Sequence, residues 1–420
     1  MKPKLLTTLQ DYSAPQFASD ALAGVTVAMV AIPLSIAIAI ASGAAPETGL
    51  ITAIVGGLLI SALGGSRVQI GGPTGAFIVV VYSVIVEHGY DGLVLATLMA
   101  GGILLVAALL RAGSLVAYVP QAVVNGFTIG IGVIIGASQL KDFLGLGVDS
   151  VPADFLDKVA VLWAARDTLD VTAFGVGLAA LVLIVALRRL SARVPGPIIA
   201  VALVSAAIAL FGFDTDTIAS RYGELPRGLP APSLPAITVD RMVELLPSAL
   251  VIAFLAAIES LLSAMVADRM IEGQHRPNAE VLAQGCANIG SALFGGLPAT
   301  GAIARTATNV SAGGRTPVAG IVHALAILLV LLLAAPLAGY MAMPALAALL
   351  ILTAWNMTEP HKWADYWRSP VEERGLLVLT LVLTVVADLT VAIGVGVALG
   401  LALRLRESSR KPPEWDEPKR

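Results

Sequence analysis

The chain has 420 residues, of which 57% are hydrophobic and only 13% charged, and its mean hydropathy is +0.87. This balance excludes a soluble globular protein of that length and indicates an all-α polytopic membrane protein. The net charge of −3 gives no sign of the basic face that nucleic acid would require. The single cysteine, Cys286, excludes an intramolecular disulfide.

A polar start precedes a long series of apolar segments. Residues 1–20 are polar with scattered apolar side chains, which predicts a short interfacial helix. The apolar segments of the first half lie at 21–42, 49–63, 69–86, 92–110, 116–140, 171–187 and 197–212. Those of the second half lie at 247–267, 279–294, 298–310, 317–337, 342–357, 375–387 and 389–405. Hydropathy therefore predicts about fourteen transmembrane segments, two of them short.

The charges in the connections predict how these segments are oriented. With the N-terminus inside, the inner connections carry mostly basic residues such as Arg188, Arg276 and Arg374, and the outer ones are mainly acidic. An excess of Lys and Arg marks the cytoplasmic side of a membrane. We therefore expect both termini in the cytoplasm, in an inner (plasma) membrane. Seven segments per half is an odd number, so the two halves are expected to be inverted repeats.

Four further stretches connect or end these segments. Residues 151–169 outside and 359–367 inside are amphipathic and too polar to span. Residues 214–240 form a Pro-rich outer linker between the halves, and 404–420 form a charged end that carries Pro412 and Pro413. Such a composition predicts a disordered cytoplasmic tail.

A Gly- and Pro-rich motif occurs once in each half. Gly71-Gly72-Pro73-Thr74-Gly75-Ala76 in the first half is matched by a stretch from Gly295 to Ala302 with the same Gly-Gly, Pro and Thr-Gly-Ala order, 226 residues later when Gly75 is compared with Gly301. Paired interruptions of this kind in corresponding positions of two halves indicate the binding site of a transporter. We expect half-helices starting near Thr74 and Thr300, in segments 3 and 10, to meet near the membrane midplane.

Two facing half-helix starts would form a site for an anion. Their free N–H groups and positive dipole ends attract negative charge, and Gly75 and Gly301 would let a ligand approach the backbone. The alternative is that these small residues only allow helices to pack closely.

Three polar residues are expected near this site. Arg305 lies about one helical turn past Thr300 and needs a partner or a cavity, because a charge in the membrane is costly. Its partner would be either the anion or Glu259, as a structural ion pair. Glu259 and Ser263 lie four residues apart and so share a helix face, where they could take up a proton or hold Na⁺.

The other polar residues in the spans have structural interpretations. Gln121, Asn125, Gln284 and Asn288 are expected to form hydrogen bonds between helices, with ligand contacts as the alternative. His323 is expected to be a packed neutral group. We find no metal-ligand cluster, nucleophile and base pair or phosphate loop, so no cofactor, no metal and no enzymatic reaction is predicted.

The sequence resembles the sulfate permease (SulP) family of anion transporters, which includes prestin. The resemblance is carried by Ala31-Ile32-Pro33 with 37–43, by Gly64-Gly65-Ser66-Arg67 before the first Gly-Pro motif, and by Arg305 followed by Gly313-Gly314-Arg315-Thr316. It implies a seven-plus-seven inverted repeat, a homodimer and a core that moves against a gate. The expected division is an interfacial segment (1–20), core (21–111), gate (112–213), outer linker (214–240), core (241–338), gate (339–406) and tail (407–420).

The sequence departs from the family pattern at three points. Members usually continue into a cytoplasmic STAS domain, whereas this sequence stops at Arg420 and thus represents a shortened chain or a short member. Leu34 replaces the common Gln after the first-helix Pro. Ile303 stands where bicarbonate carriers of the family have a Thr that helps to bind Na⁺, which favours H⁺ over Na⁺.

Together, these features predict a secondary active transporter of sulfate, bicarbonate, chloride or dicarboxylate. We expect proton symport by an elevator mechanism, with Glu259 and Ser263 as the coupling-ion site. The alternatives are an anion channel or exchanger of the same fold, and a nucleobase permease. The expected substrate-binding residues lie at the two half-helix starts and on the first segment: Thr74, Gly75, Ala76, Thr300, Gly301, Ala302, Ile303, Arg305 and Ile38.

Overall fold

The computed structural model describes residues 2–113, 120–148, 151–190, 195–387, 391–392, 394–400 and 402. Within these ranges, seven helical stretches are long and apolar enough to cross a membrane: α2 (Ala14–Ala41), Pro46–Leu63, Gly75–Leu109, α6 (Gln121–Leu144), α8 (Val171–Leu190), α11 (Val239–Ile271) and α14 (Val318–Gly339). Shorter helices are α9 (Gly196–Phe211), α12 (Pro277–Leu293), α13 (Ile303–Ser311), α15 (Met343–Met357) and α17 (Val371–Val386). Most expected segments are therefore helical. Of the last one, 389–405, residues 391–392, 394–400 and 402 are described and are helical, whereas the expected tail lies outside the described residues.

Two of the long stretches are interrupted. Pro46–Leu63 consists of α3 (Pro46–Ile51), a π-helical turn (Thr52–Gly56) and α4 (Gly57–Leu63). Gly75–Leu109 consists of a 3₁₀ turn (Gly75–Phe77) and α5 (Ile78–Leu109), which is broken at Gly89, where φ is +70°. Only glycine adopts that backbone region easily, so Gly89 separates the expected segments 69–86 and 92–110.

Short helices lie in the connections. The stretch 151–169, which is expected outside, contains α7 (Phe155–Ala164), and the stretch 359–367, which is expected inside, leads into α16 (Trp363–Arg368). The linker 214–240 contains α10 (Ile218–Tyr222), and α1 (Lys4–Thr8) precedes α2. A capping box between Ser13 and Gln16 starts α2, since each side chain binds the other's backbone N–H.

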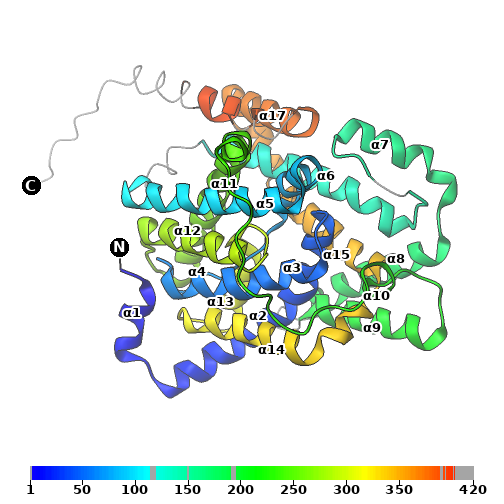
Figure 1. The fold of residues 1–420 in the computed structure, drawn as a ribbon, viewed down its shortest axis with the longest axis horizontal. Helices are drawn as coiled ribbons and strands as arrows, with labels where there is room; N and C mark the ends of the chain where they lie inside the picture. The colour runs from blue at the N-terminus through cyan, green and yellow to red at the C-terminus, as the bar shows by residue number, and fades with distance from the viewer. Residues whose placement is uncertain are drawn as a thin grey trace, which may run out of the picture.

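The helices form two packing groups (Figure 1). In one, α5 packs on α11 and α12, α2 packs on α14, and α4 packs on both α12 and α14; we call this the α5 group. In the other, the α6 group, α6 packs on α15 and α17, and α8 packs on α15 and α9. The groups meet where α2 lies against α9 and α15. Each group combines helices from both halves of the chain, as interleaved repeats would.

A short antiparallel strand pair joins the two halves inside the α5 group. β1 (Gly71–Gly72) pairs with β2 (Thr300–Gly301), with Gly71 opposite Gly301 and Gly72 opposite Thr300. The Ala302 N–H extends the pairing by donating to the Ile70 carbonyl at 2.9 Å. The two copies of the Gly-Pro motif therefore bind each other.

Side chains satisfy the irregular backbone next to these strands. Asn288 binds both backbone groups of Ala299: it donates to the carbonyl at 2.9 Å and accepts from the N–H at 3.0 Å. In the π-helical turn, Thr52 Oγ1 accepts from the Leu297 N–H at 2.6 Å. Non-helical backbone at membrane depth requires such partners, because lipid offers none.

Candidate anion site

The second half-helix begins without a side-chain cap. α13 starts at Ile303, so the expected start near Thr300 is wrong by three residues: Thr300 belongs to β2, and its hydroxyl donates to the Ala256 carbonyl at 3.0 Å. Ala302 occupies the N-cap position and has no side chain that could accept a hydrogen bond. The first intrahelical bond runs from the Thr306 N–H to the Ala302 carbonyl. The three preceding N–H groups thus point away from the helix without a cap.

The first half-helix begins in the same way. Thr74 is the N-cap of the 3₁₀ turn Gly75–Phe77, but its hydroxyl makes no capping bond. Instead it donates to Glu259 Oε2 of α11 at 2.7 Å. A Cβ added to Gly75 would lie 3.2 Å from Met357 Sδ, so this glycine faces α15 of the α6 group.

Arg305 lies inside the protein next to the strand pair. Its side chain is 2% exposed, and Nη2 donates to Ser35 Oγ and to the Pro73 carbonyl, both at 3.1 Å. Nε and Nη1 have no hydrogen-bond partner among the described residues. Any Cβ on Gly72, whose φ is +153°, would collide with Nη1. Glycine is therefore required there for the guanidinium to fit.

The alternative of an ion pair between Arg305 and Glu259 is not realised in the described residues. Arg305 reaches toward Ser35 on α2, whereas Glu259 faces Thr74 and a cavity. The buried guanidinium therefore keeps a positive charge that no carboxylate in the described part of the chain neutralises at hydrogen-bond distance.

A cavity of about 80 Å³ adjoins the start of α13. Ile303, the first residue of α13, is 43% exposed and lines it together with Glu259 of α11 and Phe127 of α6. Ser263 does not join them, since it is fully buried and its hydroxyl donates to Thr306 Oγ1 at 3.2 Å. Glu259 and Ser263 thus share a helix but face different neighbours, and their pairing in one ion site stays a prediction.

The remaining expected residues are enclosed. Ile38 and Ala76 are each 2% exposed, and Ala302 is 8% exposed. The position of a Cβ on Gly301 is already filled by the Gln69 side chain. At Gly301 the missing side chain therefore makes room for a neighbouring amide and not for a ligand.

A buried carboxylate that the sequence analysis did not single out organises the same region. Glu280, in the first turn of α12, is fully buried and accepts from the N–H groups of Gly65 and Ser66 at 2.9 and 3.1 Å. It also accepts from Ser260 Oγ and Gln284 Nε2, both at 2.9 Å. Gln69 and Gln284 in turn donate to Ser260 Oγ at 2.7 and 2.6 Å. The usable signal was the i, i+4 spacing of Glu280 and Gln284 on an otherwise apolar segment.

The other polar predictions have mixed outcomes. Gln284 forms a hydrogen bond between helices as expected, to Ser260 on α11. Asn288 instead binds the backbone of Ala299, the residue before β2. Gln121 donates to Asn125 on its own helix, so the interhelical assignment of this pair is wrong. His323 is fully buried as expected, and neither ring nitrogen has a hydrogen-bond partner in the described part of the chain.

Comparison with known proteins identifies the family. The profile of the sulfate permease family matches residues 17–382. The chain belongs to this family. Within it, the chain is 42% identical over 371 residues to YvdB of Bacillus subtilis (strain 168), which carries a provisional sulfate transporter name; the match covers 88% of this chain and 70% of YvdB. It is 31% identical to the bicarbonate transporter BicA of Picosynechococcus sp., over 79% of this chain and 60% of BicA.

Solved structures agree with this assignment. The transmembrane domain of a cyanobacterial bicarbonate transporter BicA superimposes with a TM-score of 0.81 at 31% identity, over 91% of this chain and 99% of that domain. The murine anion transporter Slc26a9 in its inward-facing state superimposes with a TM-score of 0.86 at 18% identity, over 96% of this chain and 71% of that one, which supports the fold alone. The family and its named relatives are transporters and not enzymes.

Proposed function

We propose that this protein is a secondary active transporter of a small anion such as sulfate, bicarbonate, chloride or a dicarboxylate. The anion binds at the uncapped start of α13, in the cavity between Ile303, Glu259 and Phe127. The relatives named for sulfate and bicarbonate transport support this substrate class. They give no support to the nucleobase alternative.

One observation carries the proposal: α13 begins uncapped at a cavity, two residues before a buried and incompletely bonded guanidinium. The free N–H groups and the positive dipole end attract an anion, and Arg305 adds a full charge. A buried charge without a partner is costly, so an arrangement of this kind persists where a ligand supplies the missing charge.

Glu259 is the proposed site of proton coupling. It lines the cavity that would hold the anion, so an ionised Glu259 repels that anion and a protonated one does not. Proton and anion binding then favour each other by linkage, as symport requires. Na⁺ is the weaker alternative, because the Ser263 hydroxyl binds Thr306 and does not line the cavity with Glu259.

The two packing groups are the proposed moving parts. The α5 group contains both half-helices and would carry the anion as a rigid unit past the α6 group, as core and gate of an elevator. A homodimer would hold the gate in the membrane. We place the protein in the inner membrane with both termini in the cytoplasm, as its loop charges predict.

Substitution of Arg305 tests the binding site. In purified protein, Arg305→Ala is expected to weaken sulfate or bicarbonate binding by about 10- to 100-fold, because the buried positive charge two residues from the start of α13 is lost, while the protein stays monodisperse. Arg315→Ala removes an exposed arginine four residues beyond α13 and is the matched control. Unchanged affinity in a titration of folded Arg305→Ala contradicts the site.

Flux measurements in proteoliposomes distinguish a carrier from a channel. Unlabelled anion on the opposite side is expected to accelerate uptake of labelled anion, because a carrier returns faster when loaded. Flux that is indifferent to the opposite side identifies a channel of the same fold instead.

A further inference from the structure

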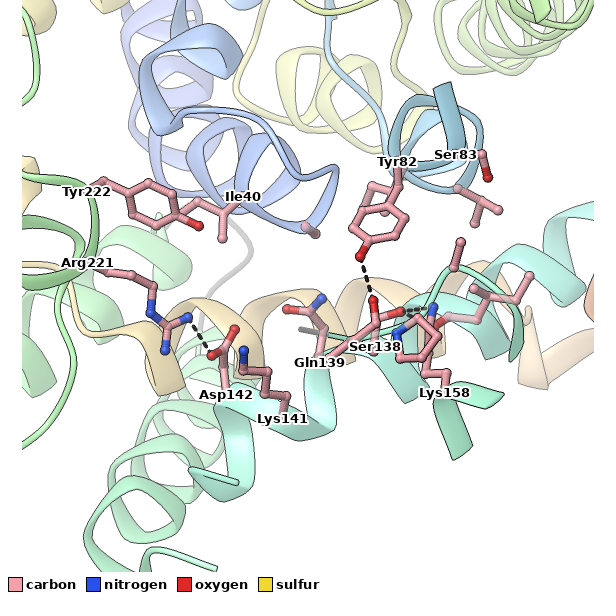
Figure 2. A pocket seen from close by; sticks show the side chains of 17 residues that line it. Ile40, Tyr82, Ser83, Ser138, Gln139, Lys141, Asp142, Lys158, Arg221 and Tyr222 are labelled. Atoms are coloured by element: carbon pink, nitrogen blue, oxygen red, sulfur yellow. Dashed lines mark hydrogen bonds and ion pairs between the residues drawn. The ribbon is translucent and has the colours of Figure 1, made fainter. Parts of the chain in front are cut away.

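A second cavity, of about 260 Å³, lies where helices of the two packing groups come together (Figure 2). Its walls come from α2 (Ile40), α5 (Tyr82), α6 (Gln139), α7 (Lys158) and α10 (Tyr222). Ile78 and Val79, one helical turn from the start of the first half-helix at Gly75, also line it. The loop charges predict that α7 and α10 lie outside, so on that topology the cavity faces the outer solution.

Lys158 occupies an unusual position in this cavity. It lies four residues before Leu162 on the buried face of α7, and it is 4% exposed where a lysine normally extends its ammonium into water. Its Nζ donates to Ser138 Oγ at 2.7 Å and makes no ion pair among the described residues. An ammonium has three N–H donors, so two are left for a ligand in the cavity.

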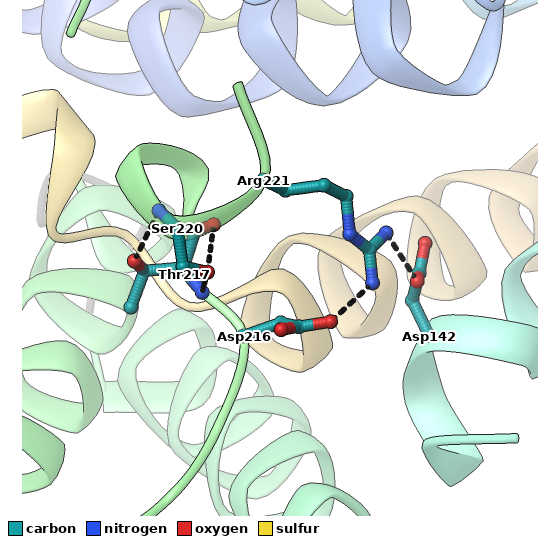
Figure 3. A network of polar contacts seen from close by, with 5 residues as sticks. All are labelled: Asp142, Asp216, Thr217, Ser220 and Arg221. Carbon is teal, nitrogen blue, oxygen red and sulfur yellow. Dashed lines mark hydrogen bonds and ion pairs between the residues drawn. The ribbon is translucent and has the colours of Figure 1, made fainter. Parts of the chain in front are cut away.

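The charge of the cavity wall favours a negative ligand. Among the described residues, Lys141, Lys158 and Arg221 line it together with one acidic side chain, Asp142. Asp142 is already bound to Arg221 at 2.7 Å, and Asp216 binds the other guanidinium nitrogen at 2.7 Å (Figure 3). Within the described part of the chain, Lys158 is thus left without an acidic partner at ion-pair distance, while Arg221 has two.

The neighbouring polar groups do not neutralise Lys158. The Tyr82 hydroxyl faces the same space from α5 and donates to the Val151 carbonyl at 2.6 Å. Asp154, the N-cap residue of α7, lies one turn before Lys158 and interacts with its ammonium electrostatically without forming an ion pair. Burial lowers the pKa of the Lys158 ammonium to about 8, which Asp154 partly opposes, so the group is charged at neutral pH.

We propose that this cavity is a second, outer anion site, in which the Lys158 ammonium binds a small inorganic anion before it reaches the start of the half-helices. The inference rests on the proposed function only for the direction of travel, because anion binding at Lys158 does not require transport. The volume suits a sulfate or chloride ion with several waters, since a water occupies about 30 Å³ in the liquid.

Anion protection of Lys158 tests the site. The full chain in detergent is treated with trace acetic anhydride at pH 8 in sodium gluconate, and acetylation of each lysine is quantified by mass spectrometry as sulfate or chloride replaces gluconate. We expect saturable protection of Lys158 by at least fivefold with one of these ions. Lys362, which is paired with Glu359 and does not line the cavity, serves as the internal reference.

One variant separates this proposal from the proposed function. Arg305→Ala, which disables the inner site, is expected to keep the protection of Lys158. If protection disappears in that variant, it arises from the inner site and the outer site is refuted. Saturable protection by neither ion in the unmodified chain refutes it as well.

Equilibrium dialysis covers the case in which the reagent does not reach Lys158. In the Arg305→Ala background, labelled sulfate or chloride is expected to bind at about one site per chain, and Lys158→Gln is expected to remove that site. Lys158→Arg keeps the charge and is the matched control. Equal binding with and without Lys158→Gln overturns the proposal.

Discussion

Two carboxylates of the α5 group, Glu280 and Glu259, lie in similar surroundings but differ in their partners. Glu280 is fully buried and accepts four hydrogen bonds, two of them from backbone N–H groups 215 and 214 residues away. Glu259 lines a cavity and accepts one, from Thr74. The first carboxylate holds a turn in place, and the second, which has a single hydrogen bond to lose, is the group proposed to take up a proton.

The same contrast distinguishes polar groups that hold the fold together from polar groups that could bind a ligand elsewhere in the protein. Asp20 resembles Glu280, since it accepts from the backbone N–H groups of Arg315 and Thr316 at 2.7 and 3.2 Å and so fixes the Gly-Gly-Arg-Thr turn. Arg305 and Lys158 resemble Glu259, because the described residues satisfy only part of their hydrogen-bonding capacity. The number of satisfied bonds therefore indicates which groups are available to a ligand.

Removing Glu280 is expected to have the largest effect on stability. Glu280→Ala leaves the Gly65 and Ser66 N–H groups and the Ser260 hydroxyl without an acceptor, which costs roughly 3–5 kcal/mol by analogy with broken buried charge networks. We expect loss of monodisperse protein in size-exclusion chromatography. Glu280→Gln keeps part of the network, so its stability is expected to lie between that of the unmodified chain and that of Glu280→Ala. A stable Glu280→Ala protein would show that the four bonds do not mark a structural role.

The same comparison applies to a buried cation, Lys158, and it predicts that the stability of the fold depends on pH. Its folded-state pKa of about 8 lies below its ordinary value of 10.5, so between these values the unfolded chain binds more protons and stability rises with pH. We expect Lys158→Met to be more stable than the unmodified chain at pH 7 by on the order of 1–3 kcal/mol, and the difference to close above pH 10. Thermal unfolding in gluconate at pH 7 to 10 measures it. A difference that does not vary with pH would mean that Lys158 is not a buried, unpaired charge.

Thr74→Val is expected to have a smaller effect, about 1 kcal/mol, because it removes a single hydrogen bond to Glu259 without changing side-chain volume much. Proton uptake by Glu259 should become easier, since the ionised form loses its donor. The pH at which anion uptake is half-maximal is therefore expected to rise. Thr300→Val, which loses a bond to a backbone carbonyl instead, is the control, and an equal shift there would contradict the role of Thr74.

Glu259→Gln is expected to change stability least, within about 0.5 kcal/mol, because one hydrogen bond can be kept by the amide. Its functional effect should nevertheless be large: uptake no longer responds to an imposed proton gradient. Proteoliposome uptake with and without that gradient measures the coupling. Uptake that is driven by a sodium gradient at symmetrical pH would overturn proton coupling in favour of Na⁺.

The repeated Gly-Pro motif was sufficient to predict that two interrupted segments meet, because lipid cannot satisfy the broken backbone at either place and each copy needs protein around it. The motif could not predict the register of β1 and β2 or the true start of α13. Strands of two residues are too short to show the alternation of apolar and polar side chains by which a strand is recognised in a sequence. The helices were predictable from hydropathy, although hydropathy does not mark Gly89 as a break within continuous helical structure.

The partners of polar residues were the least predictable feature. Spacing of four residues correctly placed Glu259 and Ser263 on one helix, but a helix face is wide enough for the two to meet different neighbours. The filling of the Gly301 position by Gln69 depends on a residue 232 positions earlier (301 − 69), and a single sequence read by itself carries no record of that contact. Local patterns therefore indicate candidates, and only the fold decides between them.

The strand pair between the two halves has a consequence for how the protein is made. Gly71 leaves the ribosome 230 residues before its partner Gly301 (301 − 71). At about 5–20 residues per second, β1 spends roughly 10–50 s in or near the bilayer with its backbone unpaired. Neither half can satisfy its own interruption, so the first half should remain associated with the insertion machinery until the second arrives. Two separately translated halves that meet in one membrane should restore the pair.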